Sequence, residues 1–253
     1  MHILITGAAG AIGSALGRAF RARHPAASFT LADVDGPGAA ALAASLGAAD
    51  PAGWDLSHPD TLPGALQAAE DRRGPVDVLV NCAGIMEMRT LATTPWSLGA
   101  RLIDIDLVSP LRLMSLVVPA MISRRAGSIV NVSSMAGVTP LRGCAYYGAA
   151  KAGLAMASEI ARIELSPHGV QVLTVYPGPV RSGLEQRARA QVPEALLTRV
   201  LPTGDPEALA RRVLDARDRG EPRVVYPSLY DVANRVPRVA GWFTSRFSPV
   251  PHS

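Results

Sequence analysis

The stretch that decides the fold is HILITGAAGAIG at residues 2–13, in which an apolar run enters a turn containing Gly7, Gly10 and Gly13. A helical pattern over Ala11–Arg23 follows this turn. Glycines between a strand and a helix allow a tight turn, and they let backbone N–H groups approach a pyrophosphate at the positive helix N-terminus. The sequence therefore predicts a dinucleotide-binding turn at the start of the chain.

A carboxylate follows the second apolar run at the distance that such a turn leads us to expect. Asp33 comes directly after the run Ser28–Ala32 and lies 20 residues after Gly13. A carboxylate there accepts hydrogen bonds from the adenosine ribose hydroxyls and repels a 2′-phosphate. The alternative is an ordinary turn aspartate before Asp35-Gly36. Because no Arg or Lys occurs in the glycine turn or beside Asp33, the sequence favours NAD(H) over NADP(H).

Short apolar runs alternate with longer Ala- and Leu-rich helical patterns along the chain. The predicted strands are Ile3–Thr6, Ser28–Ala32, Val76–Asn81, Ser128–Ser133, Val170–Tyr176 and Arg223–Tyr226. The predicted helices are Ala11–Arg23, Gly38–Leu46, Thr61–Arg72, Pro95–Ala120, Tyr146–Leu165 and Pro206–Arg219. Continuous apolar strands separated by helices indicate an α/β fold with a doubly wound parallel sheet. Ligands of such sheets bind beyond the carboxyl ends of the strands.

The length of 253 residues and the hydrophobic fraction of 48% suit a single domain over residues 1–253. Residues 181–202 form an amphipathic insertion that we expect to be a substrate lid, and residues 227–253 an irregular C-terminal tail. The longest apolar stretch, residues 107–121, contains Arg112 and two prolines, so no transmembrane span is expected. An apolar run begins directly after Met1, so no signal peptide is expected.

Charge, cysteine content and histidine spacing exclude several classes of protein. The net charge of +4 arises from scattered cations with acids among them, so no nucleic-acid partner is expected. Cys82 and Cys144 cannot make a disulfide framework and fit a reducing cytoplasm. Histidines in the predicted turns lack a second ligand at metal spacing, so no metal site is expected; these are His24, His58 and His168.

The most informative segment is Gly127–Lys151, where a predicted strand is followed by Ser134 and a helix opens at Tyr146. Tyr147 and Lys151 are four residues apart and share one face of this helix, whereas Tyr146 has no such partner. A neighbouring ammonium lowers the pKa of a phenol from about 10, as does an oxidised nicotinamide. Tyr147 is then able to exchange a proton with an alcohol or ketone during hydride transfer. Lys151 is the only lysine among 25 basic residues, as a chemical requirement for an ammonium would produce.

Together with these residues, further motifs resemble the compact branch of the short-chain dehydrogenase/reductase family. Trp54-Asp55-Leu56-Ser57 is similar to its adenine-contacting segment after the third strand, and Asn81-Cys82-Ala83-Gly84 to its Asn-x-Ala-Gly turn. Tyr176–Ser182 is similar to the segment that fixes the nicotinamide carboxamide. The resemblance covers about the first 180 residues and implies a Rossmann-type sheet of about seven strands in the order 3-2-1-4-5-6-7.

The resemblance also implies roles for individual residues. Ser134 lies 13 residues before Tyr147, at the family's spacing, and would hydrogen-bond the substrate oxygen. Lys151 would bind ribose hydroxyls and assist Tyr147. The cofactor-binding residues that the resemblance implies are Gly7, Ala9, Gly10, Ala11, Ile12, Gly13, Asp33, Asp55, Leu56, Asn81, Ala83, Gly84, Tyr147, Lys151, Pro177, Gly178, Val180 and Ser182.

Two positions depart from the family pattern. Ala11 replaces the middle glycine of the turn, and the resulting spacing is commoner in the extended branch, which includes sugar-nucleotide epimerases and dehydratases. Asp106 stands where the family usually has an Asn that holds a water connecting the lysine to solvent. We expect Asp106 to join the catalytic group, either by accepting from that water or by pairing with Lys151 at a cost in desolvation, with an altered pH profile.

The surroundings of the reacting groups predict the substrate and the assembly. Apolar residues in loops expected to face the reacting carbon indicate an apolar pocket; they are Met86, Met135, Leu141 and Cys144. By resemblance, a homodimer or homotetramer would form through the helices Pro95–Ala120 and Tyr146–Leu165. Prolines in the aromatic tail argue against a continuous membrane-binding helix there.

The sequence thus predicts a cytoplasmic NAD(H)-dependent oxidoreductase that interconverts an apolar secondary alcohol and its ketone, with Tyr147 as the general acid/base. One alternative is a sugar-nucleotide epimerase or dehydratase, which only the glycine spacing favours. The other is a non-catalytic, dinucleotide-sensing regulator, in which we expect the tyrosine–lysine pair to be damaged.

Overall fold

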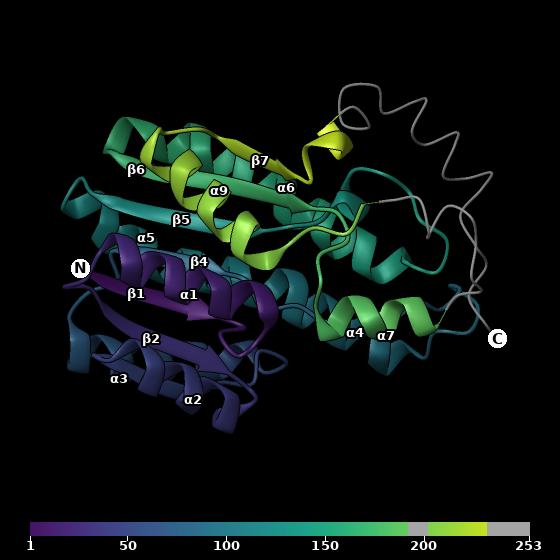
Figure 1. Cartoon of the computed structure of the whole chain (residues 1–253), viewed down its shortest axis with the longest axis horizontal. Helices are drawn as coiled ribbons and strands as arrows, with labels where there is room; N and C mark the ends of the chain where they lie inside the picture. The colour runs from purple at the N-terminus through teal and green to yellow at the C-terminus, as the bar shows by residue number, and fades with distance from the viewer. Residues whose placement is uncertain (192–201, 232–253) are drawn as a thin grey trace.

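Seven parallel strands form one sheet in the order β3-β2-β1-β4-β5-β6-β7 (Figure 1). The computed structural model describes residues 1–191 and 202–231. The strands are β1 His2–Thr6, β2 Ser28–Asp33, β3 Ala49–Gly53, β4 Val78–Asn81, β5 Gly127–Val132, β6 Val170–Pro177 and β7 Arg223–Tyr226. The predicted doubly wound sheet and its strand order are confirmed. Since the order reverses between β1 and β4, the carboxyl ends of these two strands border the crevice in which such folds bind ligands.

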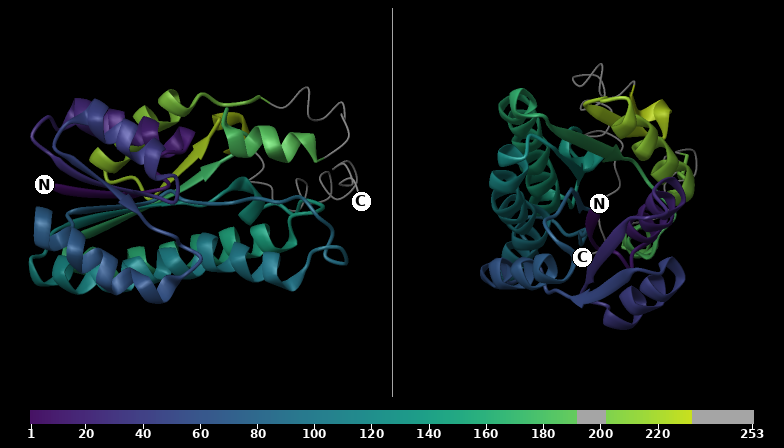
Figure 2. Two further views of the ribbon diagram at one scale, coloured as in Figure 1. Left: turned by 90° about the horizontal axis from the view of Figure 1, so that it is seen from below. Right: turned by 90° about the vertical axis from the view of Figure 1, so that its left-hand side faces the viewer.

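Helices cover both faces of the sheet, which Figure 2 shows between two helical layers. Successive side chains of β1 point to opposite faces of the sheet and so enter two separate cores. Ile3 and Ile5 pack with α1, α2 and α9, whereas Leu4 packs with α3 and α5. This follows from the period of two in a strand. The helices are α1 Ala11–Arg23, α2 Gly36–Leu46, α3 Leu62–Arg73, α4 Trp96–Ile103, α5 Ser109–Ser123, α6 Ala145–Leu165, α7 Gly183–Ala190 and α9 Pro206–Asp218.

Strand β3 is missing from the strands that the apolar runs predict. Its sequence, ADPAG, carries no apolar pattern, and its residues are only partly buried or exposed. β3 lies at the edge of the sheet and pairs with β2 alone. Pro51 has no N–H to donate to a ladder, and an edge strand tolerates this loss. Its place in the sheet therefore comes from its neighbour β2 rather than from local apolar patterning.

The helix predicted over Pro95–Ala120 is divided into α4, a π-helical turn over Asp104–Val108, and α5. Pro110 has no N–H to bond the Asp106 carbonyl, and its ring would collide with that carbonyl in a regular α-helix. The wider turn relieves this conflict, and it places Asp106 on the buried side, fully enclosed.

The predicted lid and tail are described only in part. Within residues 181–202, the structure contains helix α7, which begins after Ser182, and residues 192–201 lie outside the described part. The predicted tail over residues 227–253 starts with a 3₁₀ turn, Ser228–Tyr230, and residues 232–253 lie outside the described part.

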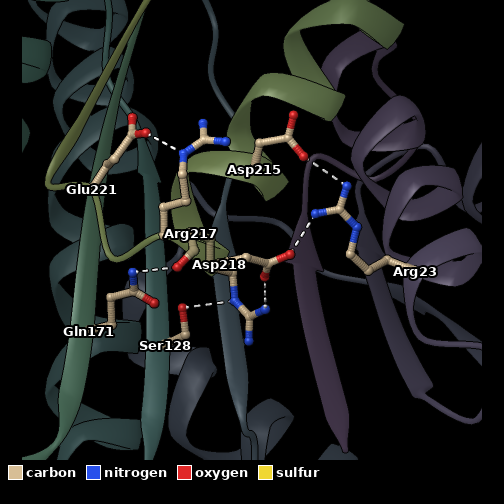
Figure 3. A network of polar contacts seen from close by, with 8 residues as sticks. Arg23, Ser128, Gln171, Asp215, Arg217, Asp218 and Glu221 are labelled. Carbon is tan, nitrogen blue, oxygen red and sulfur yellow. Dashed lines mark hydrogen bonds and ion pairs between the residues drawn. The ribbon is translucent and has the colours of Figure 1, made fainter.

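Polar contacts attach α9 to α1 and to the sheet (Figure 3). Arg23, the last residue of α1, donates to Asp215 at 2.8 Å and to Asp218 at 2.5 Å. Arg217 Nε donates to Ser128 Oγ on β5 at 3.2 Å, and its guanidinium carbon lies 5.7 Å from the ring centroid of Phe20. Exposed ion pairs add little to stability. The attachment of α9 is therefore stabilised mainly by its buried apolar side, and these polar contacts fix its orientation.

One helical run, Trp96–Ser123, is long and apolar enough to cross a membrane by length and composition, with a mean hydropathy of 1.6 over its best 18 residues. Of that window, 44% is buried inside the protein. Leu113, Val117 and Met121 of α5 pack into the core beneath the sheet. Packing into the core thus accounts for part of the apolar character of this run.

His2 is a buried histidine whose two ring nitrogens are both engaged. It is 1% exposed, with Nδ1 2.7 Å from the Gly74 carbonyl and Nε2 2.9 Å from Thr30 Oγ1. A neutral ring satisfies both contacts, because Nδ1–H donates to Gly74 and Nε2 accepts from the Thr30 hydroxyl. Burial lowers the pKa of His2 below its usual value of 6.5.

We predict that His2 makes the protein less stable as the pH falls below about 6.5. The fold resists protonation of His2, so the unfolded chain binds more protons there and stability declines towards acid. Thermal unfolding between pH 7.5 and 5.5 measures this; each kcal/mol lost lowers Tm by about 2–4 °C in a protein of this size. His2→Gln should show a smaller drop in Tm than the wild type, and the exposed His168→Gln the same drop. Equal drops in all three proteins would contradict the prediction.

Candidate active site

The glycine turn lies against the loop that follows β4. Gly7 has φ of +66°, and a Cβ there would lie 2.6 Å from Ala83 Cα. A Cβ on Gly13 would lie 2.1 Å from the Gly7 carbonyl oxygen, so both positions require glycine. Helix α1 begins after Gly10 without a capping side chain and without an acidic residue in its first turn. Its N-terminus therefore fits the pyrophosphate of a dinucleotide, and Ala11 is accommodated in that first turn.

Asp33 is fixed beside this turn by two backbone donors. Its Oδ2 accepts from Ala9 N at 2.9 Å and its Oδ1 from Asp35 N at 2.9 Å. The carboxylate is partly exposed at the end of β2. These bonds hold a negative charge next to the glycine turn, where it is available to ribose hydroxyls.

Several residues that the resemblance implies in cofactor binding make contacts within the protein. Asn81, 2% exposed, donates to Asn131 Oδ1 at 2.8 Å. Asp55 accepts from Ser57 N at 2.9 Å and thus caps its own turn. Leu56 is buried in the core. The side chains of Asn81 and Leu56 thus belong to the framework beside the crevice.

Two polar residues that the sequence patterns did not single out organise this edge of the sheet. Thr6 Oγ1 accepts from Cys82 N at 3.1 Å and from Ala83 N at 3.3 Å, and so ties β1 to the loop after β4. Asn131 donates to Ser158 Oγ on α6 at 2.8 Å. Asn131 could have been found from the sequence as an amide inside an apolar strand, because buried polar groups need hydrogen-bond partners.

Ser134, Tyr147 and Lys151 come together beyond the carboxyl end of β5. Tyr147 and Lys151 lie one turn apart on α6, with Lys151 Nζ 5.9 Å from the Tyr147 ring centroid. Ser134 follows β5, accepts from Ala136 N at 3.1 Å and hydrogen-bonds the phenol of Tyr147. Its neighbour Ser133 donates to the Lys151 carbonyl at 2.8 Å and so anchors α6 to the end of β5.

Lys151 and Asp106 form a buried ion pair. The distance from Lys151 Nζ to Asp106 Oδ1 is 3.0 Å, and the side chains are 4% and 0% exposed. Nζ also donates to the Val132 carbonyl at 3.1 Å, and Asp106 Oδ2 accepts from Ile85 N at 3.4 Å. A Cβ on Gly84 would lie 2.6 Å from Asp106 Oδ1 and 3.2 Å from Nζ. The glycine of the Asn-x-Ala-Gly turn thus makes room for the pair.

The net shift of the Tyr147 pKa runs against the sequence-based expectation. Burial raises the pKa of Tyr147 above 10; Lys151 and the Ser134 hydrogen bond lower it, but the Asp106 charge raises it again. Burial lowers the pKa of Lys151, but Asp106 and Tyr147 together bring it above its ordinary value. Burial raises the pKa of Asp106 despite Lys151. Lys151 thus lowers the pKa of the phenol as expected, but burial and Asp106 outweigh it, so that for the chain on its own the net shift is upward.

The cysteines near this site are not activated. Burial raises the pKa of Cys82 to about 12 and that of Cys144 to about 11. Both thiols are free in the structure. They are therefore protonated at neutral pH and act as packing groups.

The predicted substrate-pocket residues differ in their exposure to solvent. Met135 is 8% exposed and packs with Tyr176, and Cys144 is 3% exposed, so both lie behind the surface of the site. Met86 and Leu141 are partly exposed in loops. Ser182 Oγ accepts from Glu185 N at 3.1 Å and so caps α7.

The remainder of the segment after β6 is closely packed. Gly178 N donates to the Tyr226 carbonyl at 2.7 Å, and a Cβ on Gly178 would meet the Tyr230 ring at 2.8 Å. Val180 is 4% exposed and bridges to Gly204. No cluster of three or more His, Cys, Asp or Glu side chains suited to a metal occurs among residues 1–191 and 202–231.

Comparison with known proteins agrees with this architecture. A family model described as short chain dehydrogenase matches residues 1–193. Galactitol 2-dehydrogenase of Agrobacterium fabrum is 34% identical over 179 residues, which cover 70% of this chain and 69% of that protein. Several other relatives match over about half of their length.

Solved structures extend the likeness to nearly the whole chain. A short-chain dehydrogenase from Streptomyces avermitilis has a TM-score of 0.81 at 25% identity, over 96% of this chain and 94% of that one. A short-chain dehydrogenase from Sphingobium yanoikuyae, in complex with NADPH, has a TM-score of 0.78 at 27% identity, over 94% of both chains. Since the family model spans most of the sequence and the fold agrees with it, this protein belongs to the short-chain dehydrogenase/reductase family, oxidoreductases with an NAD(P)-binding Rossmann fold that act on CH–OH groups.

Proposed function

We propose that this protein interconverts a secondary alcohol with apolar substituents and the corresponding ketone, and that it uses NAD(H) in preference to NADP(H). The observation that carries the proposal is the convergence of Ser134, Tyr147 and Lys151 at the carboxyl edge of the sheet. A phenol between a hydroxyl and an ammonium is suited to exchanging a proton with a substrate oxygen.

Each group has a distinct part in the proposed reaction. A bound nicotinamide dinucleotide supplies the hydride that the ketone gains, or accepts the one that the alcohol loses. The glycine turn and Asp33 would hold its pyrophosphate and adenosine ribose, and Lys151 its second ribose. Ser134 donates a hydrogen bond to the substrate oxygen and stabilises the charge that develops there. Tyr147 gives its proton to that oxygen in reduction and takes it in oxidation.

The preference for NAD(H) rests on charge at the end of β2. The Asp33 carboxylate is fixed by Ala9 N and Asp35 N. A 2′-phosphate placed beside it would meet a negative charge, and residues 6–13 and 32–36 supply no Arg or Lys to neutralise the phosphate.

Two other functions fit fewer of these observations. A sugar-nucleotide epimerase or dehydratase is favoured by the glycine spacing alone, and the structure accommodates Ala11 at the start of α1. A regulator that only senses dinucleotides has no need for a phenol and an ammonium buried beside each other. The intact Tyr147–Lys151 pair therefore favours catalysis.

The substrate is expected to lie between the loop after β4 and helix α7. Gln191, directly after α7, accepts from Met88 N at 2.7 Å, and its amide also contacts Glu87. These contacts bring the described part of the lid onto the loop that carries Met86. We propose that this lid and the rest of the chain form one domain, and that the two free thiols work in a reducing cytoplasm.

An apolar stripe on α6 supports assembly into a homodimer or homotetramer. Met156, Ile160 and Ile163 follow one another at helical spacing and are 64%, 48% and 65% exposed. Large apolar side chains gathered on one exposed helix face are typical of interaction sites. A second copy of this chain that presents the same face would bury them.

We predict that Tyr147→Phe binds NADH as the wild type does but loses turnover by at least about 100-fold, since it retains the ring and lacks the proton. NADH fluorescence titration measures binding, and absorbance at 340 nm measures turnover on a panel of hydrophobic secondary alcohols and ketones. Tyr146→Phe is the matched control and should stay near wild-type activity, because Tyr146 packs its ring on Gly99 and Trp96. Undiminished turnover of Tyr147→Phe would exclude the proposed chemistry.

We predict that the wild type binds NADH more tightly than NADPH by at least about tenfold, or 1.4 kcal/mol. Asp33→Asn should reduce this ratio, because it removes the charge that repels the 2′-phosphate. Asp35→Asn removes an equal charge two residues away and retains a capping side chain for α2, so it should leave the ratio unchanged. Equal fluorescence titrations of the wild type with the two nucleotides would contradict the prediction.

We predict that Ile160→Asp shifts the protein towards the monomer in light scattering coupled to size-exclusion chromatography. A carboxylate in the centre of the apolar stripe on α6 would lose hydration in the assembled state. Leu91→Asp introduces the same charge at an apolar residue that is 66% exposed in the loop between β4 and α4, and should not change the mass. A monomeric wild type would rule out this assembly.

A further inference from the structure

We propose that Asp106 sets this site for carbonyl reduction at neutral pH, because it takes up the charge of Lys151 and leaves Tyr147 as a proton-donating phenol. The inference rests on the proposed alcohol–ketone chemistry and assigns the direction that the site favours. It starts from one geometric fact, the enclosure of a carboxylate beside the ammonium of Lys151.

Two separate segments hold Asp106 in this position, the π-helical turn and the loop residues Gly84 and Ile85. The π-helical turn directs it inward, Ile85 N donates to its Oδ2, and the missing side chain of Gly84 leaves the space that the pair fills. Lys151 is held from the other side by the Val132 carbonyl at 3.1 Å. With Asp106 0% exposed, the pair is enclosed away from bulk solvent.

The position of the ammonium determines how strongly it acts on the phenol. Nζ lies 3.0 Å from Asp106 Oδ1 and 5.9 Å from the Tyr147 ring centroid. A cation next to an anion acts on a third group as a dipole, and its effect falls off faster with distance than that of a single charge. A phenolate at Tyr147 would therefore be the second negative charge beside one cation.

The remaining titratable and polar groups around the Lys151–Asp106 pair do not restore the positive charge that Asp106 offsets. Cys82, in the loop after β4, interacts electrostatically with Lys151, and Cys144, directly before α6, with Tyr147; burial raises the pKa of both thiols, so both are neutral. The Asp33 charge acts on Cys82 from the end of β2 and adds a further negative charge on that side. Ser134 contributes a hydrogen bond and no charge. Burial and Asp106 accordingly raise the pKa of Tyr147.

A protonated phenol matches the needs of reduction. The carbonyl carbon gains a hydride, the carbonyl oxygen gains the Tyr147 proton, and the phenolate left behind recovers a proton from solvent; the substrate is reduced at the expense of the dinucleotide. Oxidation needs the phenolate before the reaction starts, so its rate falls tenfold per pH unit below the pKa of Tyr147. Reduction stays level over the same range.

The test compares Asp106→Asn with the wild type in both directions between pH 6 and 10. Removing the carboxylate charge should shift the rising limb of the kcat/KM profile for alcohol oxidation down by about one pH unit. Oxidation at pH 7 should rise about tenfold, and the ratio of the oxidation rate to the reduction rate should rise with it. Asp104→Asn removes a partly exposed charge from the same turn and should leave both profiles unchanged. An unshifted oxidation profile in Asp106→Asn would overturn the proposal, as would an equal shift in Asp104→Asn.

A second measurement needs no dinucleotide and no substrate. Phenolate absorbance at 295 nm is titrated in the wild type, Asp106→Asn and Asp106→Ser, and the Tyr147→Phe curve is subtracted to isolate Tyr147. The Tyr147 step should appear about one pH unit lower in whichever Asp106 variant folds. If Tyr147 titrates at the same pH in the Asp106 variants as in the wild type, the inference is wrong, even where turnover is normal. If the step shifts but no alcohol or ketone is turned over, the proposed function fails and the electrostatic role of Asp106 stands.

Discussion

A single buried ammonium is the constraint on which the rest of this site depends. Lys151 is 3% exposed, and a charge in such a place is tolerated only when neighbouring groups replace the water that it has lost. The Val132 carbonyl and the Asp106 carboxylate supply that replacement, at 3.1 and 3.0 Å. Removing one partner of a buried pair typically costs about 3–5 kcal/mol, so the segments that deliver these partners are tied to the presence of Lys151.

A proline in the sequence is responsible for the position of Asp106 beside Lys151. Pro110 interrupts the hydrogen-bonding of the helix before it, and the π-helical turn that results carries Asp106 into the interior. Gly84 then has to lack a side chain, because the carboxylate and the ammonium occupy its Cβ position. Ser133 fixes α6 at the Lys151 carbonyl. Local backbone chemistry on three segments thus determines the electrostatics of one phenol.

Much of the fold follows from patterns that are local in sequence. Apolar runs alternating with helical segments predict the parallel sheet, and the turn from Gly7 to Gly13 and the i,i+4 spacing of Tyr147 and Lys151 place the candidate site at its edge. The apolar runs do not predict the edge strand β3, which only the family resemblance implies, because ADPAG becomes a strand through pairing with β2. The sign of the Tyr147 pKa shift is not predicted either, since it depends on burial and on Asp106, 41 positions earlier in the sequence. Contacts such as Asn81 with Asn131 likewise require the neighbouring strands to be known.

The attachment of α9 to α1 has a consequence for how the chain is made. Arg23 and its partner Asp218 are 195 residues apart, so at about 5–20 residues per second the ribosome needs roughly 10 s or more after completing α1 to supply its partner. Strand β1 is synthesised first but lies inside the sheet, so its packing is incomplete until β4 and α9 have been made. During that interval Phe20 and Ile5 lack much of their final packing, and the nascent chain presents the apolar surface that chaperones bind.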